Sequence, residues 1–144
     1  MEKIISIGVY NLTASRVEGV KLYAPINFWD FKIKELKERG YGCGPGGLGN
    51  KIIPDSMYLL CVWWPCAIHD HMYRDEKART LFDKWAADVV LLTNLNDWIE
   101  AKTKYQPMKA LRRHRAITYF TAVRDTGEKS FFKGKETKLC RNSE

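Results

Sequence analysis

The eight residues 66–73, CAIHDHMY, combine a cysteine, two histidines, an aspartate and a tyrosine. Pro65 precedes them and suits the first turn of a helix, where its missing N–H needs no partner. On that helix Cys66, His69, Asp70 and Tyr73 share one face, because residues three and four apart are neighbours. The face presents an imidazole, a carboxylate and a phenol together, a set that suits acid–base chemistry or metal binding.

Asp88 is the predicted partner of His69. It interrupts the apolar stripe of a second, longer helix, and an unpaired buried carboxylate is costly. A neutral histidine can satisfy such a carboxylate, and the hydrogen bond then fixes the tautomer of the ring. If the two helices pack antiparallel, as a short connection favours, the pair meets at their interface and the second ring nitrogen can accept a proton from water. Asp83 competes for this role, but it lies off the stripe, so we favour Asp88.

The predicted base acts on water, and Asp70 needs a different partner. No GxSxG motif is present, and Cys66 follows two tryptophans and a proline that suggest burial, so a serine or cysteine nucleophile is not expected. The segment 41–50, YGCGPGGLGN, holds five glycines and a proline and must be a loop with unusual backbone angles. Its carbonyl oxygens and a carboxylate would form a hard-oxygen site, which is the chemistry of calcium.

These two motifs resemble those of the phospholipase A2 superfamily. CGPGG at 43–47 is similar to that family's calcium loop, CGxGG, and CAIHDHMY is similar to its catalytic helix, CxxHDxxY. The resemblance is strong over residues 41–73 and extends more weakly through Asp88 and the segment 117–127, ITYFTAVRDTG. It implies a mainly helical fold with two antiparallel core helices, a third helix and a glycine-rich calcium loop.

The resemblance also implies an enzymatic role for three side chains. His69 corresponds to the general base, Asp88 to the aspartate that orients it, and Tyr73 to the tyrosine that supports this aspartate. The implied reaction is attack of a His69-activated water on the sn-2 ester carbonyl of a glycerophospholipid.

Calcium is the cofactor that the resemblance implies. The Asp70 carboxylate would bind it together with the backbone carbonyls of Gly42, Gly44 and Gly46. Calcium and the Gly44 N–H would stabilise the oxyanion that forms when water attacks the ester.

Four cysteines are too few for a disulfide scaffold and lack the paired CxxC spacing of zinc sites. Cys43 and Cys66 match positions that form a disulfide in secreted members of the family. Pro65 stands where those members have a further cysteine. The sequence leaves the redox state of the Cys43–Cys66 pair open, and we expect Cys61 and Cys140 to be unpaired.

Helices are the elements that must position these residues. We expect one or two short strands within residues 1–25, a short helix over 28–40, the helix over 65–74, a longer helix over 77–101, and a third helix that opens at Pro107 and ends near Gly127. The apolar stripe of the longer helix is predicted to face the core; its members are Leu81, Trp85, Asp88, Leu92, Leu95 and Ile99. We expect a polar, basic tail over 128–144, and surface positions for His71 and His114.

A chain of 144 residues, 45% of them hydrophobic, predicts a single folded domain. Its first apolar run, residues 4–10, is too short for a signal peptide or a membrane span. We therefore expect a protein made without secretion, cytoplasmic or virion-associated, and similar to short phage and bacterial members of the family.

The net charge of +7 is concentrated in residues 102–115 and 129–141. Such segments are typical of a solvated face or of a protein that meets an anionic phospholipid membrane. Nucleic acid is not the expected partner, although the first segment keeps DNA binding as an alternative. The other alternative is an inactive, phospholipase A2-like protein of a phage or bacterium that binds calcium or membrane, or is structural. The sequence does not indicate the oligomeric state.

Overall fold

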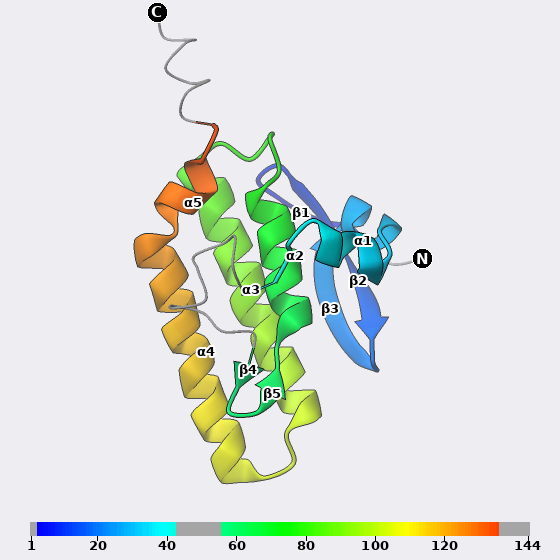
Figure 1. The fold of residues 1–144 in the computed structure, drawn as a ribbon, viewed down its shortest axis with the longest axis vertical. Coiled ribbons are helices and arrows are strands. Elements are labelled where there is room, and N and C mark those ends of the chain that lie inside the picture. Colours follow the sequence, from blue (N-terminus) through cyan, green and yellow to red (C-terminus); the bar gives the residue numbers. More distant parts are fainter. Residues whose placement is uncertain (1–2, 43–55, 136–144) are drawn as a thin grey trace, which may run out of the picture.

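Helices make up most of the described chain, which covers residues 3–42 and 56–135 of a computed structural model (Figure 1). The predicted class, mainly helical with minor β structure near the N-terminus, is confirmed. The elements are β1 (Ile5–Ile7), β2 (Tyr10–Val17), β3 (Val20–Pro25), the 3-10 helix η1 (Ile26–Asp30), α1 (Ile33–Glu38), β4 (Ser56–Met57), β5 (Leu60–Cys61), α2 (Trp63–Tyr73), α3 (Leu81–Lys102), α4 (Gln106–Thr126) and α5 (Glu128–Phe132). None of the helices within these ranges is long and apolar enough to cross a membrane.

The N-terminal strands form an antiparallel sheet in the order β1-β2-β3, one strand more than predicted. Gly8 and Gly19 lie in the two tight turns with φ of 59° and 81°, a region of backbone space that favours glycine. Strand β3 packs on α3, where Leu22 and Ala24 are buried. Asn94 of α3 fixes this contact, because its side-chain amide bonds both the N–H and the carbonyl of Tyr23, at 2.9 and 2.8 Å. Tyr10 of β2 is also buried and donates its hydroxyl to the Met72 carbonyl of α2, at 2.8 Å.

Helices α2 and α3 are antiparallel neighbours, and α4 covers another side of α3 (Figure 1). Pro65 lies in the first turn of α2, as predicted, although the helix begins two residues earlier. Helix α3 begins at Leu81 rather than near residue 77. The reason is Thr80, whose hydroxyl accepts the Asp83 N–H at 3.1 Å and forms a capping box with that residue.

The buried face of α3 differs from the predicted stripe in its first two turns. Leu81 and Trp85 are 61% and 47% exposed, so their assignment to the core was wrong. The buried side chains in these turns come from Asp83, Lys84, Ala86 and Ala87, and Asp88 is buried as predicted. Lys84 and Asp88 form an ion pair, and an apolar stripe alone cannot reveal a core position that a polar network occupies.

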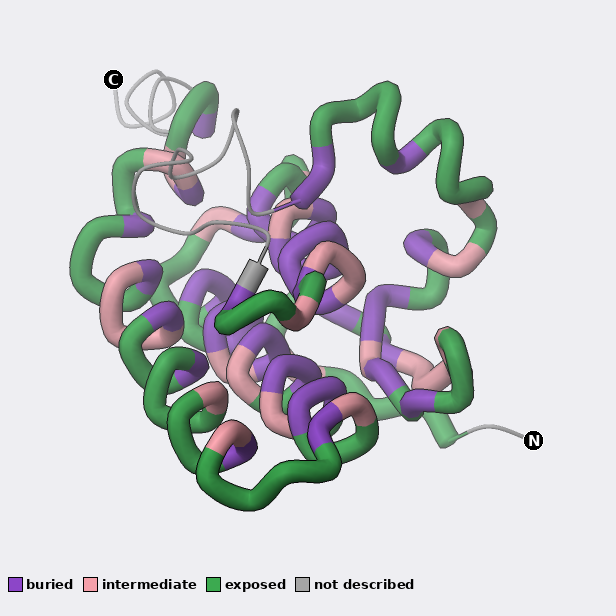
Figure 2. Tube along the Cα trace, turned by 60° about the horizontal axis from the view of Figure 1, so that its bottom comes forward, coloured by how far each residue is buried: buried purple, intermediate pink, exposed green. Residues whose placement is uncertain are grey.

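Helix α4 opens with Pro107 in its first turn and ends at Gly127, as predicted. The expectation of a polar tail from residue 128 was wrong for its first part, since α5 follows directly and buries Phe131. Figure 2 shows the buried faces of α2, α3 and α4 turned toward one another, with exposed residues on the outside. Residues 136–144 lie outside the described ranges.

The segment 56–62, for which the sequence predicted no element type, forms the β4–β5 hairpin and leads into α2. The helix predicted over 28–40 is shorter and divided, because η1 and α1 share this segment. Gly40 follows α1 with a φ of 74° and ends it, as the sequence indicated.

Candidate active site

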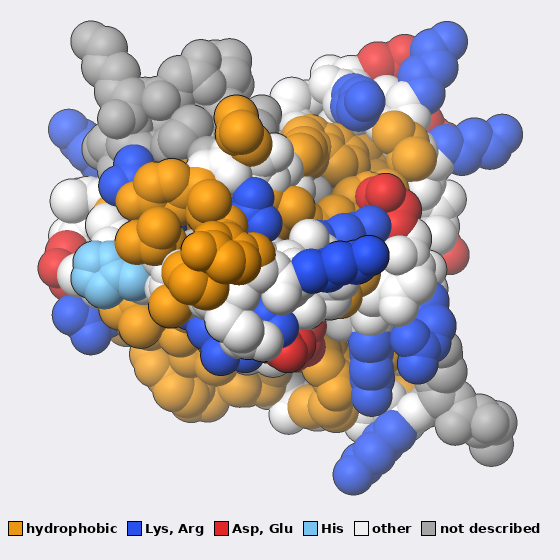
Figure 3. Space-filling view, turned by 90° about the horizontal axis from the view of Figure 1, so that it is seen from below, with side chains coloured by type: hydrophobic (Ala, Val, Ile, Leu, Met, Phe, Trp, Pro, Cys, Tyr) orange, Lys and Arg blue, Asp and Glu red, His pale blue; other side chains and the backbone are white. Residues whose placement is uncertain are grey.

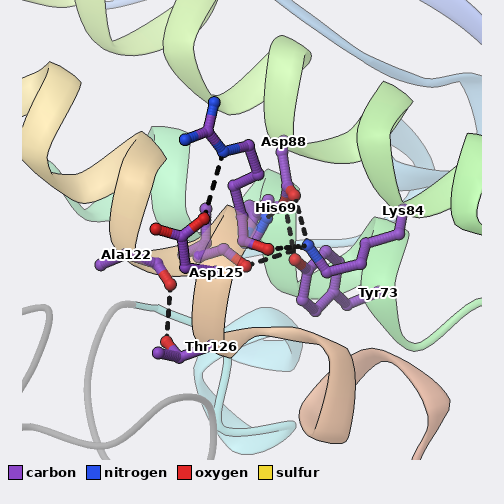
Figure 4. A network of polar contacts seen from close by, with 9 residues as sticks. His69, Tyr73, Lys84, Asp88, Ala122, Asp125 and Thr126 are labelled. Atoms are coloured by element: carbon purple, nitrogen blue, oxygen red, sulfur yellow. Dashed lines mark hydrogen bonds and ion pairs between the residues drawn. The ribbon is translucent and has the colours of Figure 1, made fainter.

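His69 and Asp88 meet at the interface of α2 and α3. His69 Nε2 lies 2.8 Å from Asp88 Oδ1, and the two residues are only 6% and 1% exposed (Figure 4). The antiparallel packing of the helices brings residue 69 of one opposite residue 88 of the other. The predicted histidine–aspartate pair is therefore present, and Asp88 rather than Asp83 is the partner.

Asp83 has a different role in the structure. Its carboxylate caps the start of α3 and also accepts the N–H of Val9, at 3.1 Å, in the turn between β1 and β2. It thus joins the sheet to α3. A carboxylate at this position belongs to the helix cap, which explains why it lies off the apolar stripe.

Tyr73 donates a hydrogen bond of 2.6 Å to Asp88 Oδ1, the same oxygen that His69 uses. The sequence resemblance predicted this contact. Burial raises the pKa of Tyr73 above its ordinary value, and the Asp88 charge adds to the effect, so the phenol stays protonated and remains a donor.

Lys84 is the partner of Asp88 that sequence reasoning missed. Its ammonium group lies 2.8 Å from Asp88 Oδ2, the oxygen that His69 and Tyr73 leave free. It also donates to the carbonyls of Val123 and Arg124 at the end of α4, at 3.0 and 3.2 Å (Figure 4). The signal was available, since a lysine four residues before an aspartate on one helix can form an ion pair with it.

The three donors determine the charge of Asp88. Burial by itself would raise the pKa of its carboxyl group, but the hydrogen bonds from His69, Lys84 and Tyr73 outweigh this effect and hold the pKa below its ordinary value. The carboxylate is therefore ionised and only accepts hydrogen bonds. His69 must therefore donate Nε2–H to it, and in the neutral form of the ring the proton acceptor is then Nδ1.

His69 Nδ1 has no hydrogen-bond partner within residues 3–42 and 56–135. The His69 ring packs on the Tyr73 ring with centroids 4.1 Å apart, and Phe131 packs edge-on against Tyr73 with centroids 5.2 Å apart. Tyr73 thus supports the His69 ring and is itself contacted by α5. Among the described residues, the arrangement leaves His69 Nδ1 without a partner and fixes Nε2 as the donor.

Asp70 lies one residue further along α2 and faces the start of the glycine-rich segment. Its Oδ2 accepts the Gly42 N–H at 2.8 Å, and its side chain is partly exposed. Gly42 has a φ of 137°, which favours glycine. Gly44 and Gly46, the other predicted carbonyl ligands, lie outside the described residues, as does the Gly44 N–H. Of the candidate metal ligands, the Asp70 carboxylate lies within the described residues, beside the start of the glycine segment. This setting fits the oxygen chemistry of calcium.

No group of three or more histidine, cysteine, aspartate or glutamate residues within the described ranges could hold a metal ion. A calcium site of the predicted kind does not need such a group, because its other ligands are backbone carbonyls. The calcium ligand set consequently stays a prediction.

His71 is not a surface residue, contrary to prediction. Its ring is 9% exposed and bonds Asn27 Oδ1 at 3.0 Å and the Tyr41 hydroxyl at 3.2 Å. Phe28 packs edge-on against it. Burial lowers the pKa of His71. It serves to join α2 to η1 and to the segment after α1, on the side of α2 away from Asp88. His114 of α4 is exposed, as predicted.

Cys61 is free and exposed, in agreement with the prediction. Cys66 is buried and disulfide-bonded. Cys43 and Cys140 both lie outside the described residues, so the Cys43–Cys66 pairing, which the sequence left open, is not tested by the structure.

Comparison of the chain with protein-family models, with curated proteins and with solved structures found no match. The chemistry of the candidate site therefore rests on its own residues and on the motifs of the sequence.

Proposed function

We propose that this protein is a calcium-dependent phospholipase of the A2 type, which hydrolyses the sn-2 acyl ester of glycerophospholipids. One observation carries the proposal. His69 donates from Nε2 to an ionised, buried Asp88 at 2.8 Å, while Nδ1 has no partner within the described residues. A histidine held in this way is suited to accept a proton from water.

The proposed reaction begins with a water molecule on the Nδ1 side of His69. Nδ1 takes a proton from this water as its oxygen attacks the ester carbonyl. The ring becomes a cation, and Asp88 stabilises it because the carboxylate lies 2.8 Å from Nε2. His69 then returns the proton to the leaving alcohol. Lys84 and Tyr73 keep Asp88 in place through both proton transfers.

Calcium is the cofactor of the proposal. Asp70 would bind it together with the carbonyls of Gly42, Gly44 and Gly46. When bound, calcium supplies positive charge for the substrate phosphate and for the oxyanion of the attacked carbonyl. Asp70 follows His69 directly on α2, so the same helix carries the proposed base and the proposed calcium ligand.

The proposed partner is an anionic phospholipid membrane, since the substrate resides there and the chain carries a net charge of +7. The experiment uses vesicles of phospholipids with a labelled sn-2 acyl chain, in calcium and in excess chelator. We expect release of labelled fatty acid in calcium and none in chelator. Equal release in both conditions would refute the calcium requirement. Label that stays in a lysophospholipid while unlabelled fatty acid is released would refute the assigned bond.

A protein that binds calcium or vesicles but releases no fatty acid would instead be the inactive, phospholipase A2-like protein of the alternative. Co-sedimentation of the same vesicle samples measures binding beside turnover, and this separates the two. A site can contain the right residues and still be inactive, since errors of about 1 Å in placement cost about 10²-fold in rate.

A further inference from the structure

The β4–β5 hairpin presents an aliphatic side chain to solvent almost completely. Leu59 is 98% exposed at the tip, and its neighbour Tyr58 is 47% exposed. Both have positive φ, at 47° and 68°, in the two-residue turn between the strands. Asparagine and glycine are the usual residues in such turns, because bulky side chains are strained there by about 1–3 kcal/mol each. Strain that keeps a leucine in water indicates a function for this tip.

Arg112 of α4 holds the tip in position. Its guanidinium group donates to the Tyr58 carbonyl at 2.6 Å and to the Thr103 hydroxyl at 2.8 Å. The hairpin is therefore attached to α4 and to the connection between α3 and α4. Helix α4 thus supports the tip that carries Leu59, and Arg112 places a positive charge beside it.

A groove of about 420 Å³ lies beside the hairpin. Its lining includes Trp63, Trp64 and the buried Trp98, together with the charged residues Lys37, Lys102 and Glu18. Lys37 Nζ lies 5.6 Å from the centre of the Trp63 ring, and Lys102 Nζ lies 4.9 Å from that of Trp98. Indole rings next to lysine ammonium groups are typical of proteins at the boundary between lipid headgroups and acyl chains.

The charge around this surface favours an anionic partner. Residues 102–123 contain six lysines and arginines and no acidic residue. Lys109 and Arg113 pair with Glu100, and Lys102 lies 3.5 Å from Glu18. Arg112 bonds only uncharged groups in its contacts with Tyr58 and Thr103, so its positive charge beside the tip is not neutralised by them. Figure 3 shows this end of the molecule, where orange hydrophobic side chains lie among blue lysine and arginine side chains. Nucleic acid would match the positive charge but would leave the exposed leucine unused.

We propose that this surface, defined here as the hairpin face (Tyr58, Leu59, Trp63 and Trp64 with Lys37 and Arg112), docks on the surface of an anionic phospholipid bilayer. Leu59 enters the acyl boundary, the partly exposed indoles of Trp63 and Trp64 lie at headgroup level, and the cations meet lipid phosphates. The proposal deepens the proposed function by naming the docking face for its substrate. Trp63 lies six residues before His69 on α2, about 9 Å along the helix, so docking brings the candidate site near the bilayer.

The test measures binding to vesicles of ether-linked phosphatidylglycerol and of ether-linked phosphatidylcholine, by co-sedimentation and by tryptophan fluorescence. We expect binding to phosphatidylglycerol, a loss of about tenfold or more in affinity for Leu59→Asp, and a loss of about fivefold for Lys37→Gln. Leu81→Asp is the matched control. Leu81 is 61% exposed at the start of α3, about 25 Å from the level of Trp98 along that helix, and this variant should bind like wild type.

Ether-linked lipids have no sn-2 ester, so this binding is measured without hydrolysis. The protein could bind ether lipids through Leu59 and yet release no fatty acid from ester lipids. That result would overturn the proposed function and would still support the docking face. Equal binding by Leu59→Asp and Leu81→Asp would overturn the docking face. So would a larger loss in Leu81→Asp, a dimer that dissociates in Leu59→Asp without any vesicle binding, or binding to DNA alone. Circular dichroism and the urea midpoint of each variant show that it is folded.

Discussion

The Lys84 ammonium group lies 2.8 Å from Asp88 Oδ2, on the side of the carboxylate that His69 and Tyr73 do not contact. The lysine is 4% exposed and the aspartate 1%. Asp88 therefore accepts three hydrogen bonds on its two carboxylate oxygens. Through Lys84, the pair is also joined to the last carbonyls of α4, which makes the end of that helix a part of the candidate site.

Replacing Lys84 with methionine should destabilise the protein strongly. The variant leaves a buried carboxylate without its ion pair, and such a change costs about 3–5 kcal/mol. Urea unfolding measures the loss in the free energy of unfolding. The exposed Lys129→Met on α5 is the control and should change it by less than about 0.5 kcal/mol. If the two variants unfold alike, Lys84 is not the ion-pair partner that supports Asp88.

Removing the Tyr73 hydroxyl in Tyr73→Phe should lower activity without unfolding the protein. The ring keeps its contacts with His69 and Phe131, but Asp88 loses a hydrogen bond of 2.6 Å. A hydrogen bond to a charged group contributes about 1.5–3 kcal/mol, so we expect a loss of that size in stability and a fall of about tenfold in fatty-acid release. Full activity in this variant would show that the orientation of Asp88 does not depend on Tyr73.

Gly127 lies where α4 ends against Tyr73. A Cβ at this position would lie 2.8 Å from the Tyr73 hydroxyl and would also overlap the Val123 carbonyl, a Lys84 acceptor. Gly127→Ala should therefore displace both supports of Asp88, and a clash of this kind typically costs about 1–3 kcal/mol. Differential scanning calorimetry gives the change, with the exposed neighbour Glu128→Ala as the control. A melting temperature equal to that of the control would contradict the close packing.

The free energy of unfolding should depend on pH through the titration of Lys135. Its ammonium group donates to the Tyr73 carbonyl at 2.7 Å, and burial lowers the pKa of Lys135 to about 8 from 10.5. Since the unfolded chain holds this proton up to higher pH than the folded chain, the free energy of unfolding should rise as pH increases above 8. Urea midpoints between pH 7 and 9.5 measure the slope. In Lys135→Met the rise of stability with pH should disappear. In Lys133→Met, where the replaced lysine is exposed, it should remain.

The sequence predicted the main pair of the candidate site because its spacing is local. His69 and Tyr73 share a face of α2 by helical periodicity, and Asp88 was recognisable as a carboxylate inside an apolar stripe. Both inferences need only the helix period and a short connection, which favours antiparallel packing. The His69–Asp88 contact at 2.8 Å agrees with them.

The errors come from contacts between distant segments. His71 looks like a polar residue on the outer side of α2, but η1 and the segment after α1 cover it with Phe28 and Tyr41. Leu81 and Trp85 fit the apolar period, yet the helix cap and the Lys84 network occupy the interior at that end of α3. Periodicity shows which residues of a helix lie together, but the tertiary packing decides which face is covered.

The most direct test of the central claim compares wild type with His69→Ala and His69→Gln in calcium-dependent release of sn-2 fatty acid from mixed vesicles. The proposed role of His69 predicts release by the wild type and a loss of about 10²–10⁴-fold in both variants, with vesicle binding unchanged. Release by either variant at the wild-type rate would contradict the assignment of His69 as the base, and with it the proposed mechanism.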